Sequence, residues 1–128
     1  MTGEARTILM EVMEMLTVDA LQEFGADTAE GLARCMNNEQ FYLRLVAMAV
    51  GDANFEKLAD AIGAQDFKAA FEAAHALKGL VGNLSLTPLF TIASEMTELL
   101  RAETEADYAP MCDELLGLRQ QLQALIDG

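Results

Sequence analysis

Residues 66–84 read DFKAAFEAAHALKGLVGNL and predict one amphipathic helix. Asp66 is placed to cap the first turn. Apolar residues recur at helical spacing and form one face, which comprises Phe67, Ala70, Ala74, Leu77 and Val81. At about 100° per residue, His75 falls at the edge of that face, roughly a quarter turn from its centre. We therefore expect a helix that packs through one side and carries a histidine beside the packed face.

The chain as a whole has the composition of an all-α protein. Its 128 residues are 52% apolar, which is enough for one domain with a buried core. Leu, Ala, Met and Glu are abundant, whereas β-branched and aromatic residues are too few to supply a sheet. We expect a single domain over residues 1–128, with an up-and-down antiparallel four-helix bundle over residues 27–126. Additional short N-terminal helices would form an extension over residues 1–26.

Local signals place the helix boundaries. An N-terminal helix is expected over residues 4–16. The expected N-caps of the later helices are Thr17, Asp27, Asn38, Asp66 and Asp107, and Glu30 would complete a capping box with Asp27. Thr87-Pro88 predicts the start of the helix that follows residues 66–84, because proline at the first helical position loses no hydrogen bond.

The helix that begins at Glu39 is expected to break between Gly51 and Asn54. An unbroken helix would place Asp52 on the buried stripe, and a break releases its carboxylate to solvent. The apolar residues expected on this stripe are Phe41, Leu45, Met48, Phe55, Ala59 and Ile62.

Charge and cysteine content exclude several kinds of partner and site. A net charge of −13 repels a phosphate backbone and an anionic membrane leaflet, so we expect neither nucleic acid nor membrane as a partner. No apolar run approaches membrane-spanning length. Cys35 and Cys112 are too few for a disulfide scaffold, and neither lies in a metal-type cluster. We expect a soluble cytoplasmic protein, without a bound metal and with a monomer favoured.

Two glycines are the most informative residues around His75. Gly79 and Gly82 follow it by four and seven positions, and each costs about 1 kcal/mol relative to alanine inside a helix. They leave the surface around the imidazole bare, which suits a histidine that another protein must reach. Lys78 places a cation beside any anionic group that the ring carries. The alternative is a surface histidine beside glycines that permit close helix packing.

The residues that follow the histidine resemble a known signature. His75-Ala76-Leu77-Lys78-Gly79, followed by Gly82-Asn83, is similar to the H-x-L-K-G motif of histidine-containing phosphotransfer (HPt) domains. In that family the motif lies in the second helix of a four-helix bundle. The similarity covers about residues 21–101 and includes the strings Gly31-Leu32-Ala33-Arg34-Cys35, Phe41-Tyr42-Leu43 and Asp66-Phe67-Lys68. Ser85 departs from the family, since many members have glycine there; we expect this change to affect the helix end more than the site.

The resemblance implies that His75 is the phosphoacceptor in a two-component phosphorelay. It would accept a phosphoryl group from a receiver-domain phosphoaspartate and pass it to another receiver. Lys78 would stabilise phosphoryl oxygens, while Gly79 and Gly82 would give clearance for the partner. The supporting candidates are Asn83, Lys68 and Glu72. The chain would be a carrier and not an enzyme, its partners would be response-regulator receiver domains and a hybrid or separate histidine kinase, and Mg²⁺ would reside on the receiver.

Two other functions fit part of the sequence. Glu72 and His75 form a Glu-x-x-His pair, the element that di-iron carboxylate bundles use twice. Here it occurs once, in a chain with one histidine, which disfavours a metal site. A phosphorylation-independent interaction module of the same fold is also compatible with the sequence, although such a module has no need for costly helix glycines. The sequence shows no Gly-rich phosphate loop and no nucleophile elbow, which disfavours a conventional enzyme.

Overall fold

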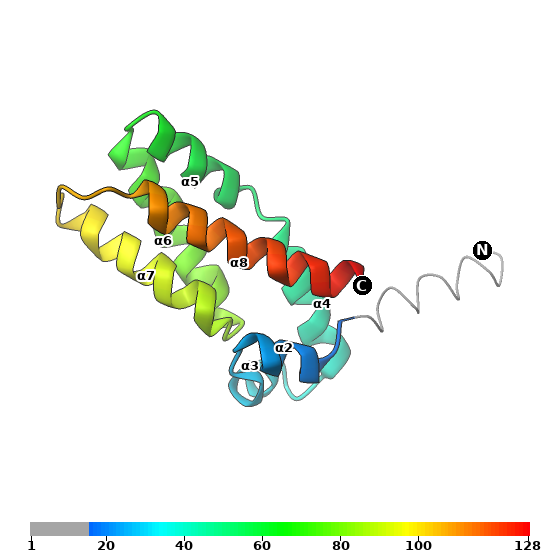
Figure 1. Cartoon of the computed structure of the whole chain (residues 1–128). Coiled ribbons are helices and arrows are strands. Elements are labelled where there is room, and N and C mark those ends of the chain that lie inside the picture. The colour runs from blue at the N-terminus through cyan, green and yellow to red at the C-terminus, as the bar shows by residue number, and fades with distance from the viewer. Residues whose placement is uncertain (1–15) are drawn as a thin grey trace.

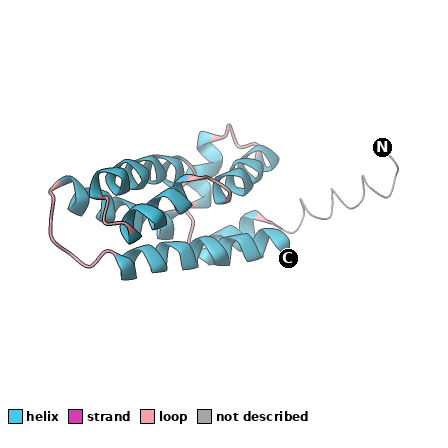
Figure 2. Cartoon of the chain, turned by 90° about the horizontal axis from the view of Figure 1, so that it is seen from above, coloured by secondary structure: helices cyan, strands magenta, loops and turns pink. Residues whose placement is uncertain are grey.

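The computed structural model describes residues 16–128, and this part of the chain contains helices but no strand (Figures 1 and 2). Its helices are α2 (Val18–Phe24), α3 (Thr28–Arg34), α4 (Glu39–Val50), α5 (Asn54–Gly63), α6 (Phe67–Asn83), α7 (Thr87–Arg101) and α8 (Ala109–Asp127). The all-α prediction is therefore confirmed. The helix predicted over residues 4–16 lies outside the described residues, except for Leu16.

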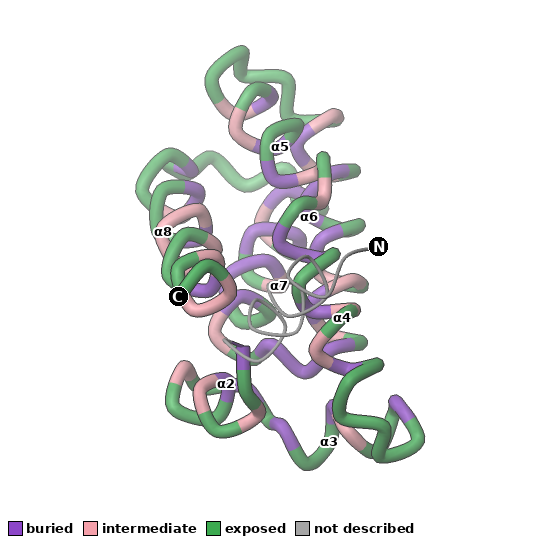
Figure 3. The backbone as a smooth tube through the Cα atoms, turned by 90° about the vertical axis from the view of Figure 1, so that its right-hand side faces the viewer, coloured by how far each residue is buried: buried purple, intermediate pink, exposed green. Residues whose placement is uncertain are grey.

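Helices α5 to α8 run alternately up and down, and α4 precedes α5 along the same side of the bundle (Figure 1). α6 packs against α5 and α7, while α8 packs against α7, α5 and α4. Figure 3 shows the buried backbone positions facing inward between these helices. Their largest buried side chains include Val46, Leu58, Leu77, Met96, Leu115 and Leu122. The short helices α2 and α3 lie at the end of the bundle near the turn between α6 and α7. The predicted helical bundle is therefore confirmed, although α3 lies at its end and not among its long helices, as a bundle over residues 27–126 would require.

The break predicted between Gly51 and Asn54 is present. α4 ends at Val50 and α5 begins at Asn54. The Asp52 carboxylate accepts hydrogen bonds from the backbone N–H and the side-chain amide of Asn54, at 2.8 and 2.9 Å. The carboxylate thereby supplies an acceptor for a backbone donor at the start of α5.

The stripe predicted for α4 is wrong at two of its three residues, while the third, Leu45, packs against the core. Phe41 and Met48 are 44% and 66% exposed, and the buried side chains of α4 are those of Tyr42, Val46, Ala49 and Val50. The prediction joined the apolar residues of two helices into one stripe. The non-helical residues between α4 and α5 change the rotation of one helix relative to the other, so a single helical period does not span the break.

Four of the predicted N-caps are confirmed. Side-chain oxygens of Thr17, Asp27, Asn38 and Asp66 each accept a hydrogen bond from a backbone N–H three residues later, at 3.0 to 3.2 Å. These bonds satisfy donors that the first helical turn leaves without partners.

Three finer predictions are wrong. Glu30 does not complete a capping box, because the backbone N–H of Asp27 donates to the carbonyl of Ser85 at 2.9 Å. The N-cap of α8 is Tyr108, one residue after Asp107, whose carboxylate accepts from the backbone N–H of Ala109 at 3.3 Å. Phe67, the first residue of α6, was predicted on the packed face but is 48% exposed, with its ring beside that of Tyr108.

Tyr42 joins α4 to the end of α6. Its side chain is fully buried, and its hydroxyl donates to the carbonyl of Leu84 at 2.8 Å. The ring also occupies the space beside Gly31, where an added Cβ would lie 2.5 Å from it. Burial raises the pKa of Tyr42 to about 12, and the charges of Cys35 and Asp27 add to the shift.

Ionisation of Tyr42 is expected to destabilise this end of the bundle. Because its folded pKa of about 12 lies above the ordinary value of 10.0, the stabilisation is complete below pH 10 and is lost as the pH rises through 12. Over this window, the free energy of unfolding of the native protein should fall by roughly 2 kcal/mol more than that of Tyr42→Phe. Chemical denaturation across the pH range measures the difference. Parallel pH profiles for the two proteins would contradict the assignment.

No helix in the described part of the chain is long and apolar enough to span a membrane.

Candidate functional site

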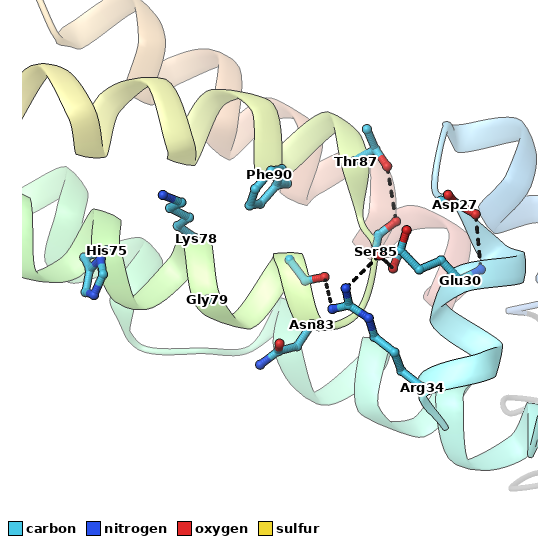
Figure 4. Close-up of a pocket in the computed structure, with 11 residues that line it drawn as sticks. Asp27, Glu30, Arg34, His75, Lys78, Gly79, Asn83, Ser85, Thr87 and Phe90 are labelled. Atoms are coloured by element: carbon cyan, nitrogen blue, oxygen red, sulfur yellow. Dashed lines mark hydrogen bonds and ion pairs between the residues drawn. The ribbon is translucent and has the colours of Figure 1, made fainter. Parts of the chain in front are cut away.

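His75 lies on the surface of α6, next to the packed face. Its side chain is exposed, whereas those of Ala73, Ala74 and Leu77 are buried. This is the edge position that the helical spacing predicts. A hollow of about 610 Å³ lies beside the imidazole, and Figure 4 shows the side chains around it. Its walls come from α6, from the first part of α7 and from α3 with its N-cap Asp27.

The two glycines near His75 have different surroundings. A Cβ added at Gly79 would meet nothing within 4 Å, so this position is open to solvent. A Cβ added at Gly82 would lie 3.1 Å from two ring atoms of Phe90 on α7. Phe90 packs against Gly82 and remains 36% exposed at the hollow. The surface is therefore bare at Gly79, while Gly82 allows the close packing of a neighbouring aromatic ring.

Lys78 extends from α6 toward α7 in Figure 4, and its ammonium group forms an ion pair with a carboxylate. Its Nζ lies 3.5 Å from Oε1 of Glu98 on α7. The same oxygen lies 3.7 Å from Nη2 of Arg101. The lysine lines the same hollow as His75, but its charge is already partly neutralised by Glu98.

The far end of the hollow is formed by α3. Arg34 donates to the carbonyl of Gly82 at 3.0 Å and pairs with Glu30 at 2.8 Å. The Ser85 hydroxyl donates to the same Glu30 side chain at 3.2 Å. These bonds, drawn in Figure 4, connect α3 to the turn that follows α6.

Ser85 adopts a left-handed backbone conformation with φ of 55°. Glycine reaches this region without the steric penalty of a Cβ, which is a physical reason to expect glycine here, as the family resemblance does. Ser85 is buried, and its hydroxyl bond to Glu30 offsets part of that penalty. The substitution lies at the end of α6, as the sequence predicts, and it also joins the turn to α3.

The three supporting candidates do not lie together. Asn83 is exposed and lines the hollow beside His75. Lys68 lines a separate hollow with Phe67 and Tyr108, near the link between α7 and α8. Glu72 lines a third hollow, between α5 and α6. Within residues 16–128, no group of three or more His, Cys, Asp or Glu side chains is close enough to hold a metal ion.

The structure adds neighbours of His75 that the sequence analysis missed. The ring of Phe71 stacks on the imidazole, with centroids 5.8 Å apart and planes 15° apart. The guanidinium carbon of Arg101 lies 5.5 Å from the centroid of the same Phe71 ring. The four-residue spacing of Phe71 and His75 is a local signal that could have revealed the stack. Arg34, Glu98 and Arg101 are distant in sequence and gave no such signal.

The family model described as "Hpt domain" matches residues 46–128, which is more than half of the chain. The chain belongs to the Hpt domain family. Hpt domains are phosphocarriers of phosphorelays and work with receiver domains and histidine kinases. The match includes all of α5 to α8 and the only histidine of the chain. No curated protein and no solved structure gives a significant match.

The two glycines of this Hpt domain should respond differently to alanine. Gly79→Ala is expected to raise the free energy of unfolding by about 0.5–1 kcal/mol, because the added methyl group meets open space and alanine favours the helix. Gly82→Ala should give no such gain, since its methyl group must displace the Phe90 ring. Urea denaturation of both variants measures the difference. Equal gains in both, or a loss at residue 79, would contradict these surroundings.

Proposed function

We propose that this chain carries a phosphoryl group on His75 between receiver domains. The observation that carries the proposal is the exposed imidazole on α6 with open space at Gly79, in a member of the Hpt domain family. A neutral imidazole nitrogen is nucleophilic near pH 7. Because α6 packs against α5 and α7, this nucleophile stands on a well-packed helix that another protein can approach.

The proposed transfer moves one phosphoryl group between two side chains. The lone pair of one imidazole nitrogen attacks the phosphorus of the receiver's aspartyl phosphate. The N–P bond forms as the P–O bond to the aspartate breaks, and the carboxylate leaves with the bonding electrons. The other ring nitrogen keeps its proton. Transfer to the next receiver reverses these changes, and Mg²⁺ is assigned to the receiver in both directions.

Lys78 is the cation proposed to stabilise the phosphoryl oxygens. Its pair with Glu98 spans 3.5 Å, and both side chains are partly exposed. Such a surface pair contributes about 0–1 kcal/mol, so the lysine can exchange it at little cost for a more highly charged phosphoryl group. Glu98 therefore competes with the phosphoryl group for the same ammonium group.

The receiver is proposed to dock over Gly79 and the hollow beside it. Gly79 lets a partner approach the imidazole closely, because no side chain projects there. Phe90 offers a partly exposed aromatic ring at the same hollow, and Asn83 offers an amide. Apolar contact at the centre of an interface, with polar groups around it, is typical of protein docking surfaces.

Phosphorylation of His75 is the central prediction. Purified protein is incubated with a receiver domain from the same organism and with acetyl phosphate as phosphodonor. We expect an acid-labile, base-stable phosphoryl adduct on the native protein and none on His75→Gln. If several receivers fail to label a protein that is shown to be folded, the phosphocarrier function is wrong and the interaction module becomes the better interpretation.

If Glu98 and the phosphoryl group compete for Lys78, removing the lysine should weaken phosphotransfer and removing the glutamate charge should favour the phosphorylated state. Lys78→Ala should slow phosphotransfer and leave the fold intact. Glu98→Gln should raise the ratio of phosphorylated to unphosphorylated His75 at equilibrium by about 2- to 5-fold, because it releases the lysine. Glu95→Gln, on the same helix, is the matched control, since Glu95 makes no ion pair with a described residue. Unchanged transfer in Lys78→Ala would remove the lysine from the site, and equal effects of the two glutamate variants would contradict the competition.

A further inference from the structure

Phe71 lies one helical turn before His75, and the two rings form a nearly parallel pair. Their centroids are 5.8 Å apart and their planes differ by 15°. This separation is within the range of favourable aromatic stacking. Side chains on an α-helix lean toward its N-terminus, so the side chain at position i+4 extends over residue i. The imidazole of His75 is thus directed back onto Phe71.

Gly79 has the same relation to His75 as His75 has to Phe71. A side chain at position 79 would lean back over the imidazole. Glycine provides none, and the space that a Cβ would occupy is open. On its N-terminal side, the imidazole therefore contacts the Phe71 ring. On its C-terminal side, no side chain at position 79 covers it.

Phe71 itself is held in place by the bundle. It is partly buried and packs against the core, whereas His75 is exposed. The guanidinium of Arg101 lies over the Phe71 ring at 5.5 Å and pairs with Glu98 on the same helix. Through this stack, the exposed imidazole of His75 contacts a ring that α6 and Arg101 of α7 hold in place.

We infer that Phe71 is a positioning residue that fixes the plane of the His75 imidazole for phosphotransfer; this inference rests on the phosphocarrier function proposed above. The nitrogen lone pairs lie in the ring plane, so in-line attack requires that plane to point at the phosphorus. The second torsion of a histidine side chain is broad when nothing contacts the ring. Stacking restricts that torsion before the receiver arrives, so less freedom is lost on reaching the transition state. Phe71 acts only through the imidazole.

The test substitution is Phe71→Leu, which keeps an apolar side chain against the core and removes the ring. The matched control is Phe67→Leu on the same helix, since the Phe67 ring contacts Tyr108 and not His75. Phe71→Tyr is the conservative variant, because it keeps an aromatic ring in the stack. Chemical denaturation of each variant establishes that it is folded at the assay temperature.

Two measurements distinguish positioning from a general structural role. The rate of transfer from a phosphorylated receiver to His75 should fall roughly 3- to 10-fold in Phe71→Leu, which corresponds to the loss of one aromatic pair. It should stay at the native rate in Phe67→Leu and in Phe71→Tyr. In NMR spectra, the chemical shifts of the imidazole ring protons should change in Phe71→Leu, because the ring current of Phe71 is lost. They should not move in Phe67→Leu.

The outcomes separate this inference from the proposed function. No labelling of the native protein overturns both. Labelling of the native protein, with Phe71→Leu transferring at the native rate or keeping its imidazole resonances, overturns the inference alone. Equal slowing in Phe67→Leu and Phe71→Leu also overturns it, because the loss would then arise from a weakened helix and not from the stack.

Discussion

The close packing of α6 between α5 and α7 is the constraint on which the rest of the structure depends. α6 contributes Ala70, Ala73 and Ala74 to the core, all buried, together with Leu77 and Val81. Short alanine side chains let neighbouring helices approach closely, and the larger side chains fill the remaining space. Because α6 makes its contacts through this face, one flank of a well-packed helix is left at the surface. His75 lies on that flank, so its backbone position is set by the core and its imidazole is accessible.

Three hydrogen-bond donors from other parts of the chain hold the end of α6 in place. The last carbonyls of a helix have no partner within it. Here the carbonyl of Gly82 in the last turn, and those of Leu84 and Ser85 just after the helix, receive donors from α3, α4 and the N-cap of α3. The donors are the Arg34 guanidinium, the Tyr42 hydroxyl and the backbone N–H of Asp27. A cation near the C-terminus of a helix is also favourable with respect to the helix dipole. These bonds place α3 against the α6–α7 turn and so form the far wall of the hollow beside His75.

Charge near His75 differs from that of the chain as a whole. The net charge is −13, yet two cations line the hollow next to the imidazole. Each has a carboxylate partner: Lys78 pairs with Glu98, and Arg34 pairs with Glu30. Arg34 is also fixed by the Gly82 carbonyl, whereas Lys78 has the longer ion pair and lies one turn from His75. The arrangement thus places one cation with a single, longer ion pair close to His75 and one cation with two partners farther away.

The sequence by itself determined the features that depend on neighbours within one or two helical turns. Caps and helical spacing predicted α6 over residues 66–84, against Phe67–Asn83 in the structure, and placed His75 at the edge of the packed face. The same signals located the break before Asn54 but not the rotation across it, so Phe41 and Met48 were assigned to the wrong face. Tertiary structure alone decided that Gly82 receives Phe90 while Gly79 stays open, and that Lys78 pairs with Glu98. These contacts join residues on different helices, and they are fixed by how the helices pack side by side, which no local spacing encodes.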